Sequence, residues 1–239
     1  MFTSNQLENL LFVDIETASS HAQFEDLSER MQKLWERKAN KFRFSDPDTS
    51  PEDLYAQKAA IFAEFGKVVC ISAGVLRFEG DQPHFHVQSY FGPDERKTLV
   101  EFGAMLQGYQ EKRPGYRLCA HNGKEFDFPY LGRRYMIHGL PIPDILQVQG
   151  KKPWETSFVD TMELWKFGDY KSYTSLDLIA AVMDIPSPKD DIDGSMVSHT
   201  FWVEGAHERI KNYCEKDVLT TAQVVLKMSR LPLVNMQEA

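Results

Sequence analysis

The chain's most informative stretch is Leu10-Leu11-Phe12-Val13-Asp14-Ile15-Glu16-Thr17. Its run of apolar residues predicts a buried strand, and two acids stand at the end of that strand. Because side chains alternate across a strand, Asp14 and Glu16 point to the same face. Adjacent carboxylates repel each other unless a cation lies between them, and hard ions such as Mg²⁺ prefer such oxygen ligands. The stretch indicates a metal site if further acids converge on it. Taken alone, it also fits a strand that simply ends in polar residues.

A further acid stands in the segment Ala120-His121-Asn122-Gly123-Lys124-Glu125-Phe126-Asp127. A short strand is expected to end at Ala120, the pair Asn122-Gly123 is typical of a turn, and Asp127 falls in the first turn of the helix that follows. In a mixed sheet, ligands collect at such a strand end. The alternative is an acid that only stabilises the start of a helix through the helix dipole.

The last acid belongs to Tyr213-Cys214-Glu215-Lys216-Asp217, within a long predicted helix. Tyr213 and Asp217 are four residues apart and therefore share one helix face. That face borders a stripe of apolar residues, where a carboxylate needs a partner or a metal ion. The alternative is a surface aspartate beside a core tyrosine.

In this order and setting, the three segments resemble those of the DEDD superfamily of 3′-5′ exonucleases, in its tyrosine subclass. The closest resemblance is to the proofreading exonuclease domain of B-family DNA polymerases. It implies a ribonuclease H-like fold, release of nucleoside 5′-monophosphates from DNA 3′ ends, and two bound divalent cations, Mg²⁺ or Mn²⁺. The implied metal-binding carboxylates are Asp14, Glu16, Asp127 and Asp217. Tyr213 would orient the attacking water, and two ions about 3.5–4 Å apart would suit this hydrolysis.

The resemblance also implies contacts to the terminal nucleotide. The backbone at Ile15 and Thr17 and the side chain of Asn122 are expected to hold it, and Phe126 is expected to pack near it. Softer features of the same family are Asp160-Thr161, a helix at Ser175-Leu176, and Lys189 followed by Asp193-Gly194.

Single-stranded DNA 3′ ends are the expected substrate. RNA is an alternative, because the same site cuts either backbone and no residue pattern here senses the 2′-hydroxyl. A non-catalytic nucleic-acid-binding protein of the same fold is a second alternative. The presence of all four acids argues against it, since clustered carboxylates without a cation destabilise a fold. The sequence identifies no protein partner.

Hydrophobic periodicity predicts one α/β domain over residues 1–239, with a mixed five-stranded sheet, helices on both faces and a helical insertion after the first strand. After the strand at 10–17, the predicted strands cover residues 68–76, 84–91, 117–120 and 158–159. The predicted helices of the main body cover residues 93–109, 126–138, 175–183 and 207–228.

The insertion at 21–65 is predicted to hold a charged amphipathic helix at 25–38 and a second helix at 51–65. The apolar stripe expected on the first helix consists of Leu27, Met31, Leu34 and Trp35. Because the insertion directly follows the strand that carries Asp14, it could form a wall or lid over the substrate. A surface or oligomer-contact helix pair is the alternative.

Bulk composition narrows the possible functions. The net charge of -8 argues against a protein that coats nucleic acid through a basic surface, but not against an enzyme that meets phosphates through bound cations. Cys70, Cys119 and Cys214 form no CxxC pair, so a reducing, cytoplasmic location is expected rather than a disulfide framework. No apolar run approaches the about 20 residues of a membrane span. No polymerase domain follows the third motif, so proofreading for a polymerase in the same chain is not expected.

Overall fold

A computed structural model describes residues 1–42, 49–169, 173–186 and 191–235. Its centre is one five-stranded sheet in the order β3-β2-β1-β4-β5. The strands are β1 (Leu10–Ser19), β2 (Gly66–Glu79), β3 (Gln82–Phe91), β4 (Arg117–Ala120) and β5 (Val159–Asp160). The pairs β1–β2 and β2–β3 are antiparallel, while β1–β4 and β4–β5 are parallel. The predicted mixed five-stranded sheet is confirmed, and its order is that of a ribonuclease H-like α/β fold.

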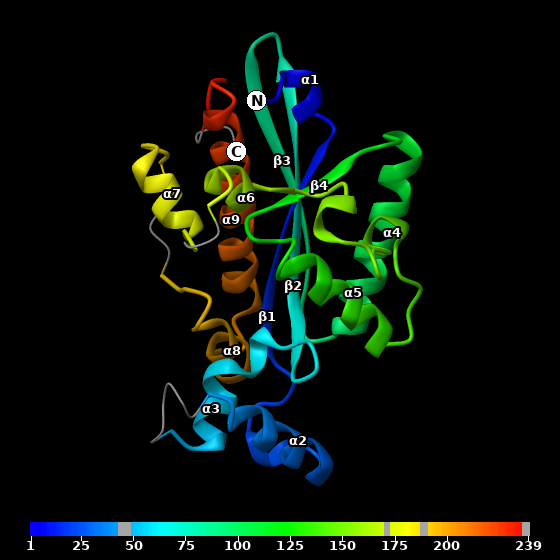
Figure 1. Cartoon of the computed structure of the whole chain (residues 1–239), viewed down its shortest axis with the longest axis vertical. Helices are drawn as coiled ribbons and strands as arrows, with labels where there is room; N and C mark the ends of the chain where they lie inside the picture. Colours follow the sequence, from blue (N-terminus) through cyan, green and yellow to red (C-terminus); the bar gives the residue numbers. More distant parts are fainter. Residues whose placement is uncertain (43–48, 170–172, 187–190, 236–239) are drawn as a thin grey trace.

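Helices cover both faces of this sheet (Figure 1). They are α1 (Ser4–Leu7), α2 (Glu29–Ala39), α3 (Pro51–Lys58), α4 (Glu95–Lys112), α5 (Asp127–Ile137), α6 (Thr161–Lys166), α7 (Leu176–Val182), α8 (Val197–His199) and α9 (His207–Met228). Short turns of helix are η1 (Phe24–Asp26), η2 (Ala59–Ile61), η3 (Asp144–Leu146), η4 (Pro153–Glu155) and η5 (Thr200–Glu204). Helices α4 and α5 lie on one face and α9 runs along the other. The predicted bounds of α9 are confirmed, whereas α6 and α8 were not predicted, because each is too short for a periodic pattern.

The strand β1 separates two hydrophobic cores. Its alternate residues Leu11, Val13 and Ile15 belong to the core shared with α4 and α5. Leu10 and Phe12 belong to the core shared with α9. Because of this alternation, the even-numbered residues that continue the second series face α9.

The sequence analysis predicted that the two acids stand at the end of β1, but the structure places them within the strand. The strand continues for three residues beyond Glu16 and pairs with β2 as far as Ser19. The reason is the length of β2, which begins at Gly66 and gives the end of β1 an antiparallel partner. The register shifts between Glu16 and Thr17, which marks a bulge next to the acids.

Next to the acids, β1 lacks a neighbouring strand on one side, within the described residues. On its other side β1 pairs with the short β4 only over Leu10–Phe12, opposite Arg117–Cys119. Beyond this point no strand among the described residues pairs with the edge of β1 on that side. The start of α5 fills the space, so Asp127 comes next to β1.

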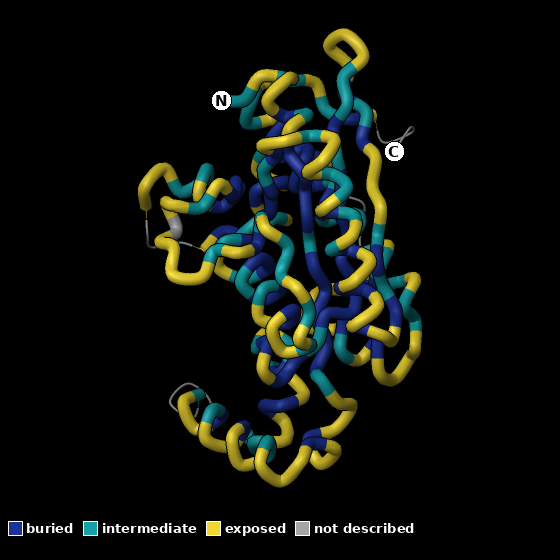
Figure 2. Tube along the Cα trace, turned by 90° about the vertical axis from the view of Figure 1, so that its right-hand side faces the viewer, coloured by how far each residue is buried: buried dark blue, intermediate teal, exposed yellow. Residues whose placement is uncertain are grey.

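The insertion forms two helices at one end of the molecule (Figures 1 and 2). Helix α2 begins after the cap residue Ser28, not at residue 25, and α3 ends at Lys58 before the short turn η2. Three members of the expected apolar stripe pack inward, but Leu34 is 39% exposed. Leu34 lies on the far side of the helix from Ala39, so it misses the buried face.

Within the described residues, no helix has the length and apolar character needed to cross a membrane.

Candidate active site

Asp14 and Glu16 lie side by side on the face of β1 that α9 covers. Glu16 is buried, and Asp14 is half-buried. The thiol of Cys214 on α9 donates a hydrogen bond of 3.3 Å to Oδ2 of Asp14. One ligand atom from each of Asp14, Glu16 and Cys214 lies within 4.8 Å of the other two, close enough to surround a single ion. The strand's alternation therefore brings the two carboxylates together, as the sequence predicts.

Asp127 reaches the same place from the opposite side. It is the first residue of α5 and is buried. Its Oδ1 accepts a hydrogen bond of 3.2 Å from the backbone N–H of Ile15. That N–H lies on the edge of β1 that β4 leaves open, so the carboxylate replaces a missing strand partner. This bond holds Asp127 against β1, next to the two acids of that strand.

Tyr213 and Asp217 lie one turn apart on α9, and both line the cavity above the β1 acids. Burial, together with the charges of Asp217, Glu16 and Asp14, raises the pKa of the Tyr213 phenol. A hydrogen bond to Asp217 raises that pKa further. The phenol therefore stays neutral at physiological pH and can donate or accept a hydrogen bond, but it cannot serve as a base.

Electrostatics shows that the acids converge. Burial, followed by the charges of Asp127 and Asp217, raises the pKa of Asp14 well above its ordinary value. Burial and the charge of Asp14 do the same to the pKa of Glu16. Burial raises the pKa of Asp127 to about 7, against the hydrogen bond from Ile15, which lowers it. Burial and acidic neighbours dominate these pKa shifts, and a bound cation would relieve the repulsion between the carboxylates.

These side chains open into one cavity of about 700 Å³. Its walls come from β1, the β4–α5 turn, α7 and α9, together with the segment before α8. The lining residues are Asp14, Ile15, Glu16, His121, Asn122, Phe126, Asp127, Tyr173, Ser175, Leu176, Asp177, Ile192, Asp193, Tyr213, Asp217 and Thr220. All five expected catalytic residues lie in this wall, and so do Ile15, Asn122 and Phe126. Thr17 does not line it, because its side chain is buried beside Tyr130.

The turn that presents Asn122 is held by Asp160. Asn122 adopts a left-handed backbone with φ of 60°, which asparagine tolerates better than most residues. Its backbone N–H donates to Asp160 Oδ1 at 2.9 Å, and that of Lys124 donates to Oδ2 at 3.1 Å. Asp160 also caps α6 through the N–H of Met162. The buried Asp160 is thus a positioning residue for the cavity wall, and only the softer family features pointed to it.

Other wall residues were missed by sequence reasoning. Tyr173 is 71% exposed at the rim, and Asp177 and Thr220 lie in the wall beside it. Tyr173 belongs to a loop without periodicity, and Asp177 looks like an ordinary first-turn acid of α7. Only Thr220, three residues after Asp217 on α9, carried a signal, because it shares a helix face with Asp217. The expected Lys189 lies outside the described residues.

No residue of the insertion at 21–65 belongs to the described wall of this cavity. The insertion leaves β1 beyond Glu16 and folds at the end of the molecule (Figure 1). The expectation of a wall or lid formed by these helices therefore has no support in the described residues.

Comparison with known proteins supports the fold and assigns the chain to a family. A sheet of this order is consistent with a ribonuclease H-like fold, and acids from β1, α5 and α9 line one cavity in it. Residues 61–235 match the model of a family described as a predicted 3′-5′ exonuclease related to the exonuclease domain of PolB. The chain belongs to this family of 3′-5′ exonucleases, whose members are typically metal-dependent. The matched segment contains Asp127, Tyr213 and Asp217 and begins after the β1 acids.

Among solved structures, the chain resembles the family B DNA polymerase from the hyperthermophilic archaeon Pyrobaculum calidifontis. The TM-score is 0.54 at 15% sequence identity, and the match covers 92% of this chain. At this identity the likeness concerns the fold. The chain spans 24% of the polymerase's length. No curated protein matches the chain.

Proposed function

We propose that the chain is a metal-dependent 3′-5′ exonuclease of the tyrosine subclass, which removes nucleoside 5′-monophosphates from DNA 3′ ends. One observation carries the proposal. Carboxylates from three separate elements meet in one cavity, and burial and mutual repulsion raise the pKa of Asp14, Glu16 and Asp127. Bound cations would stabilise such an arrangement at neutral pH, and a nucleic acid chain is a substrate that cations can hold.

The residues present fit two divalent cations, Mg²⁺ or Mn²⁺. Asp14, Glu16, Asp127 and Asp217 would hold them, since all four offer hard oxygen ligands at the cavity wall. When bound, such ions activate a water and neutralise charge on the phosphate and the leaving 3′ oxygen. Two such ions would also offset the repulsion between the four carboxylates, which burial strengthens.

The chain's own residues would then orient the reactants. Tyr213 keeps its proton and offers a hydrogen bond to the attacking water, which it positions beside Asp217. Asn122 and Phe126 would hold the terminal nucleotide together with the backbone of Ile15, which lines the same cavity. Thr17, expected at this contact, would act only through the backbone of β1. The open cavity suits a single frayed strand better than a rigid duplex.

Location and substrate type also remain proposals. The three cysteines are free and buried, which suits the reducing cytoplasm. RNA is kept as a second substrate, because nothing in the described wall selects against a 2′-hydroxyl. A non-catalytic nucleic-acid-binding role is weaker, because a binding protein does not need a cluster of buried carboxylates with raised pKa values.

The test uses end-labelled single-stranded DNA and RNA, each with Mg²⁺, Mn²⁺ or excess chelator, with products resolved by length. We expect cleavage with either ion and none with chelator. Metal binding is measured separately by calorimetry on wild type and Asp217→Asn, and we expect the variant to bind fewer or weaker ions. Full activity in chelator would overturn the metal-dependent mechanism. Metal binding without any cleavage would favour the non-catalytic alternative.

A further inference from the structure

The exposed face of α2 carries four positive side chains in a row. They are Arg30, Lys33, Arg37 and Lys41, the last in the turn that continues the helix. Steps of three and four residues place them along one side of the helix, here called the basic face of α2. Within the described residues none of the four forms an ion pair. Glu29 and Glu36 lie together along one edge of this face.

The opposite face of α2 is locked in place. Trp35 is fully buried, and its indole N–H donates to the carbonyl of Pro51 at 2.7 Å. Its ring contacts those of Tyr55 and Phe65 edge-on, with centroids 5.4 and 5.0 Å away. The helix cannot roll about its axis without breaking these contacts. The four basic residues are exposed, so the basic face has a fixed orientation toward solvent.

Hydrogen bonds from the main body fix the insertion as a whole. Tyr130 donates to the carbonyl of Ala60 at 2.9 Å, and Arg134 donates to that of Ala63 at 2.7 Å. Both donors are buried residues of α5, the helix that begins with Asp127. The basic face is thus held rigidly relative to the catalytic cavity, although it lies outside the cavity.

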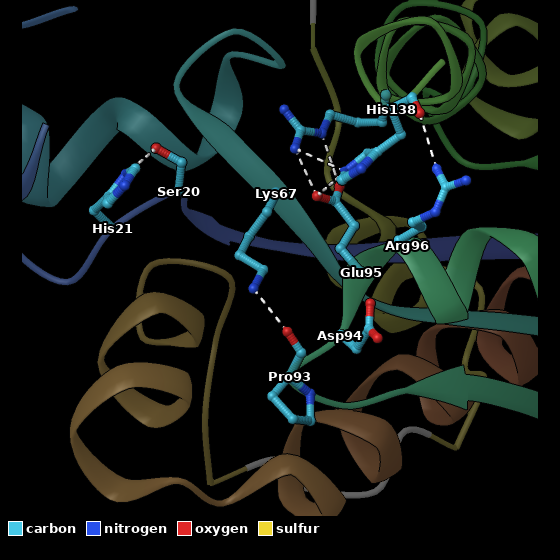
Figure 3. A pocket seen from close by; sticks show the side chains of 9 residues that line it. Ser20, His21, Lys67, Pro93, Asp94, Glu95, Arg96 and His138 are labelled. Carbon is cyan, nitrogen blue, oxygen red and sulfur yellow. Dashed lines mark hydrogen bonds and ion pairs between the residues drawn. The ribbon is translucent and has the colours of Figure 1, made fainter. Parts of the chain in front are cut away.

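A second group of cations lines a pocket where the insertion begins, beside Ser20 and His21 (Figure 3). Its cations are already engaged. Lys67 donates to the carbonyl of Pro93 at 2.9 Å, and Arg134 is paired with Glu95 at 2.6 Å. Arg96 donates to the carbonyl of His138. The basic face of α2 differs, because its four cations are exposed, follow one another along one helix side and form no ion pair within the described residues.

We propose that the basic face of α2 binds the phosphate backbone of the substrate strand, upstream of the end held in the catalytic cavity. The inference rests on the proposed function, because that function supplies a polyanionic partner. Charge complementarity favours this partner. The whole chain carries a net charge of -8, which disfavours contact with nucleic acid, so a row of four exposed cations without ion pairs in the described residues is a local exception. Only a strand long enough to reach from the cavity to α2 would gain from the contact.

The experiment compares two variants of equal net charge. In the first, Arg30→Gln, Lys33→Gln, Arg37→Gln and Lys41→Gln are combined. In the matched control, four exposed lysines of the main body are changed, Lys97→Gln, Lys112→Gln, Lys151→Gln and Lys227→Gln. All eight side chains are exposed, so both variants should fold with stability close to wild type, checked by thermal unfolding.

Binding of a long fluorescent oligothymidylate is measured by anisotropy in excess chelator, without turnover, across a range of salt concentrations. For the α2 variant we expect about tenfold weaker binding or more at low salt. The slope of log affinity against log salt should fall by about 1 to 3, because each single-strand phosphate contact adds about 0.7. The control variant should change both quantities much less. With Mg²⁺, the α2 variant should lose rate on the long strand but cleave a trinucleotide at the wild-type rate.

Equal losses in the two variants would overturn the inference, because they would reflect overall charge alone. Unchanged binding by the α2 variant would overturn it too, and would leave the basic face as a solvated helix side or a site for an acidic protein. The two proposals fail separately. If the wild type never cleaves but the α2 variant binds the strand more weakly, this inference stands and the exonuclease proposal fails. If cleavage is normal and the α2 variant binds as the wild type does, the exonuclease proposal stands and this inference fails.

Discussion

Tyr213 tests the mechanism at the scale of a single residue. Its phenol lines the cavity, and its raised pKa keeps it neutral. Tyr213→Phe preserves the ring and removes only the hydroxyl. We expect the rate to fall about 10-fold to 1,000-fold, in the range of contributions from a positioned proton-bearing group. Single-turnover kinetics measures the loss, and calorimetry should find metal binding almost unchanged. A variant as fast as wild type would make Tyr213 a packing residue.

Asp14 tests whether the acids repel one another without a cation. The pKa of this group is raised by burial and by its acidic neighbours, so its ionised form opposes folding at neutral pH. Asp14→Asn should therefore raise the melting temperature of the metal-free protein at pH 7 and abolish cleavage. Calorimetric unfolding with and without Mg²⁺ measures this. A lower melting temperature for the metal-free variant would contradict the repulsion.

At the scale of elements, an ion pair joins α4 to α5, the helix that carries Asp127. Glu95 accepts hydrogen bonds from Arg134, His138 and the N–H of Val68. Burial alone would raise the pKa of Glu95, but these partners outweigh it and hold the pKa below its ordinary value. Figure 3 shows Glu95 facing His138 from the start of α4. The network also anchors the insertion through the bond from Arg134 to Ala63.

Arg134→Met leaves the Glu95 carboxylate buried without its main partner. We expect a loss of about 3–5 kcal/mol in the free energy of unfolding, the usual cost of breaking a buried ion pair. Denaturant unfolding at neutral pH measures it. Lys97→Gln serves as the control, because its pair with Glu101 is exposed and should be worth at most about 1 kcal/mol. Similar losses in both variants would show that the Glu95 network adds no special stability.

Sequence reasoning predicted the elements with clear periodicity, and it failed where tertiary contacts decide. The long helix α9 showed its apolar stripe, so its bounds and the pair Tyr213 and Asp217 were found. The end of β1 was misplaced, because the length of an antiparallel partner cannot be read from one strand. Leu34 looked like a core residue by spacing but lies on the exposed side of α2. Asp160 was named only as a softer family feature, and its positioning role escaped, because that role depends on backbone N–H groups 38 and 36 residues away in the sequence.

For the whole molecule, two sets of groups predict how stability depends on pH without metal. Asp14, Glu16 and Asp127 have raised pKa values when folded, so their protonated forms favour the native state. Stability from these groups is present below the ordinary carboxylate pKa and is lost as pH rises toward the folded values, about 7 for Asp127. Glu95 has a lowered pKa, so its contribution is present above its ordinary pKa and is lost as pH falls.

The metal-free protein should therefore be most stable near about pH 5 and lose stability toward pH 8. Mg²⁺ should restore stability mainly at the higher pH, where the carboxylates are ionised. Chemical unfolding across this range, with Mg²⁺ or chelator, measures both effects. A metal-free stability that rises steadily from pH 5 to pH 8 would contradict the carboxylate cluster.

The most direct test of exonuclease action at this cavity uses single-stranded DNA labelled at its 5′ end. Wild type and Asp14→Asn are incubated with Mg²⁺ side by side, with a circular strand of the same sequence as the control. Wild type should give a ladder that shortens from the 3′ end and should release nucleoside 5′-monophosphates, while the circle stays intact. Asp14→Asn should leave the labelled strand at full length. Cutting of the circle, or an undiminished ladder from Asp14→Asn, would contradict a 3′-5′ exonuclease built on these acids.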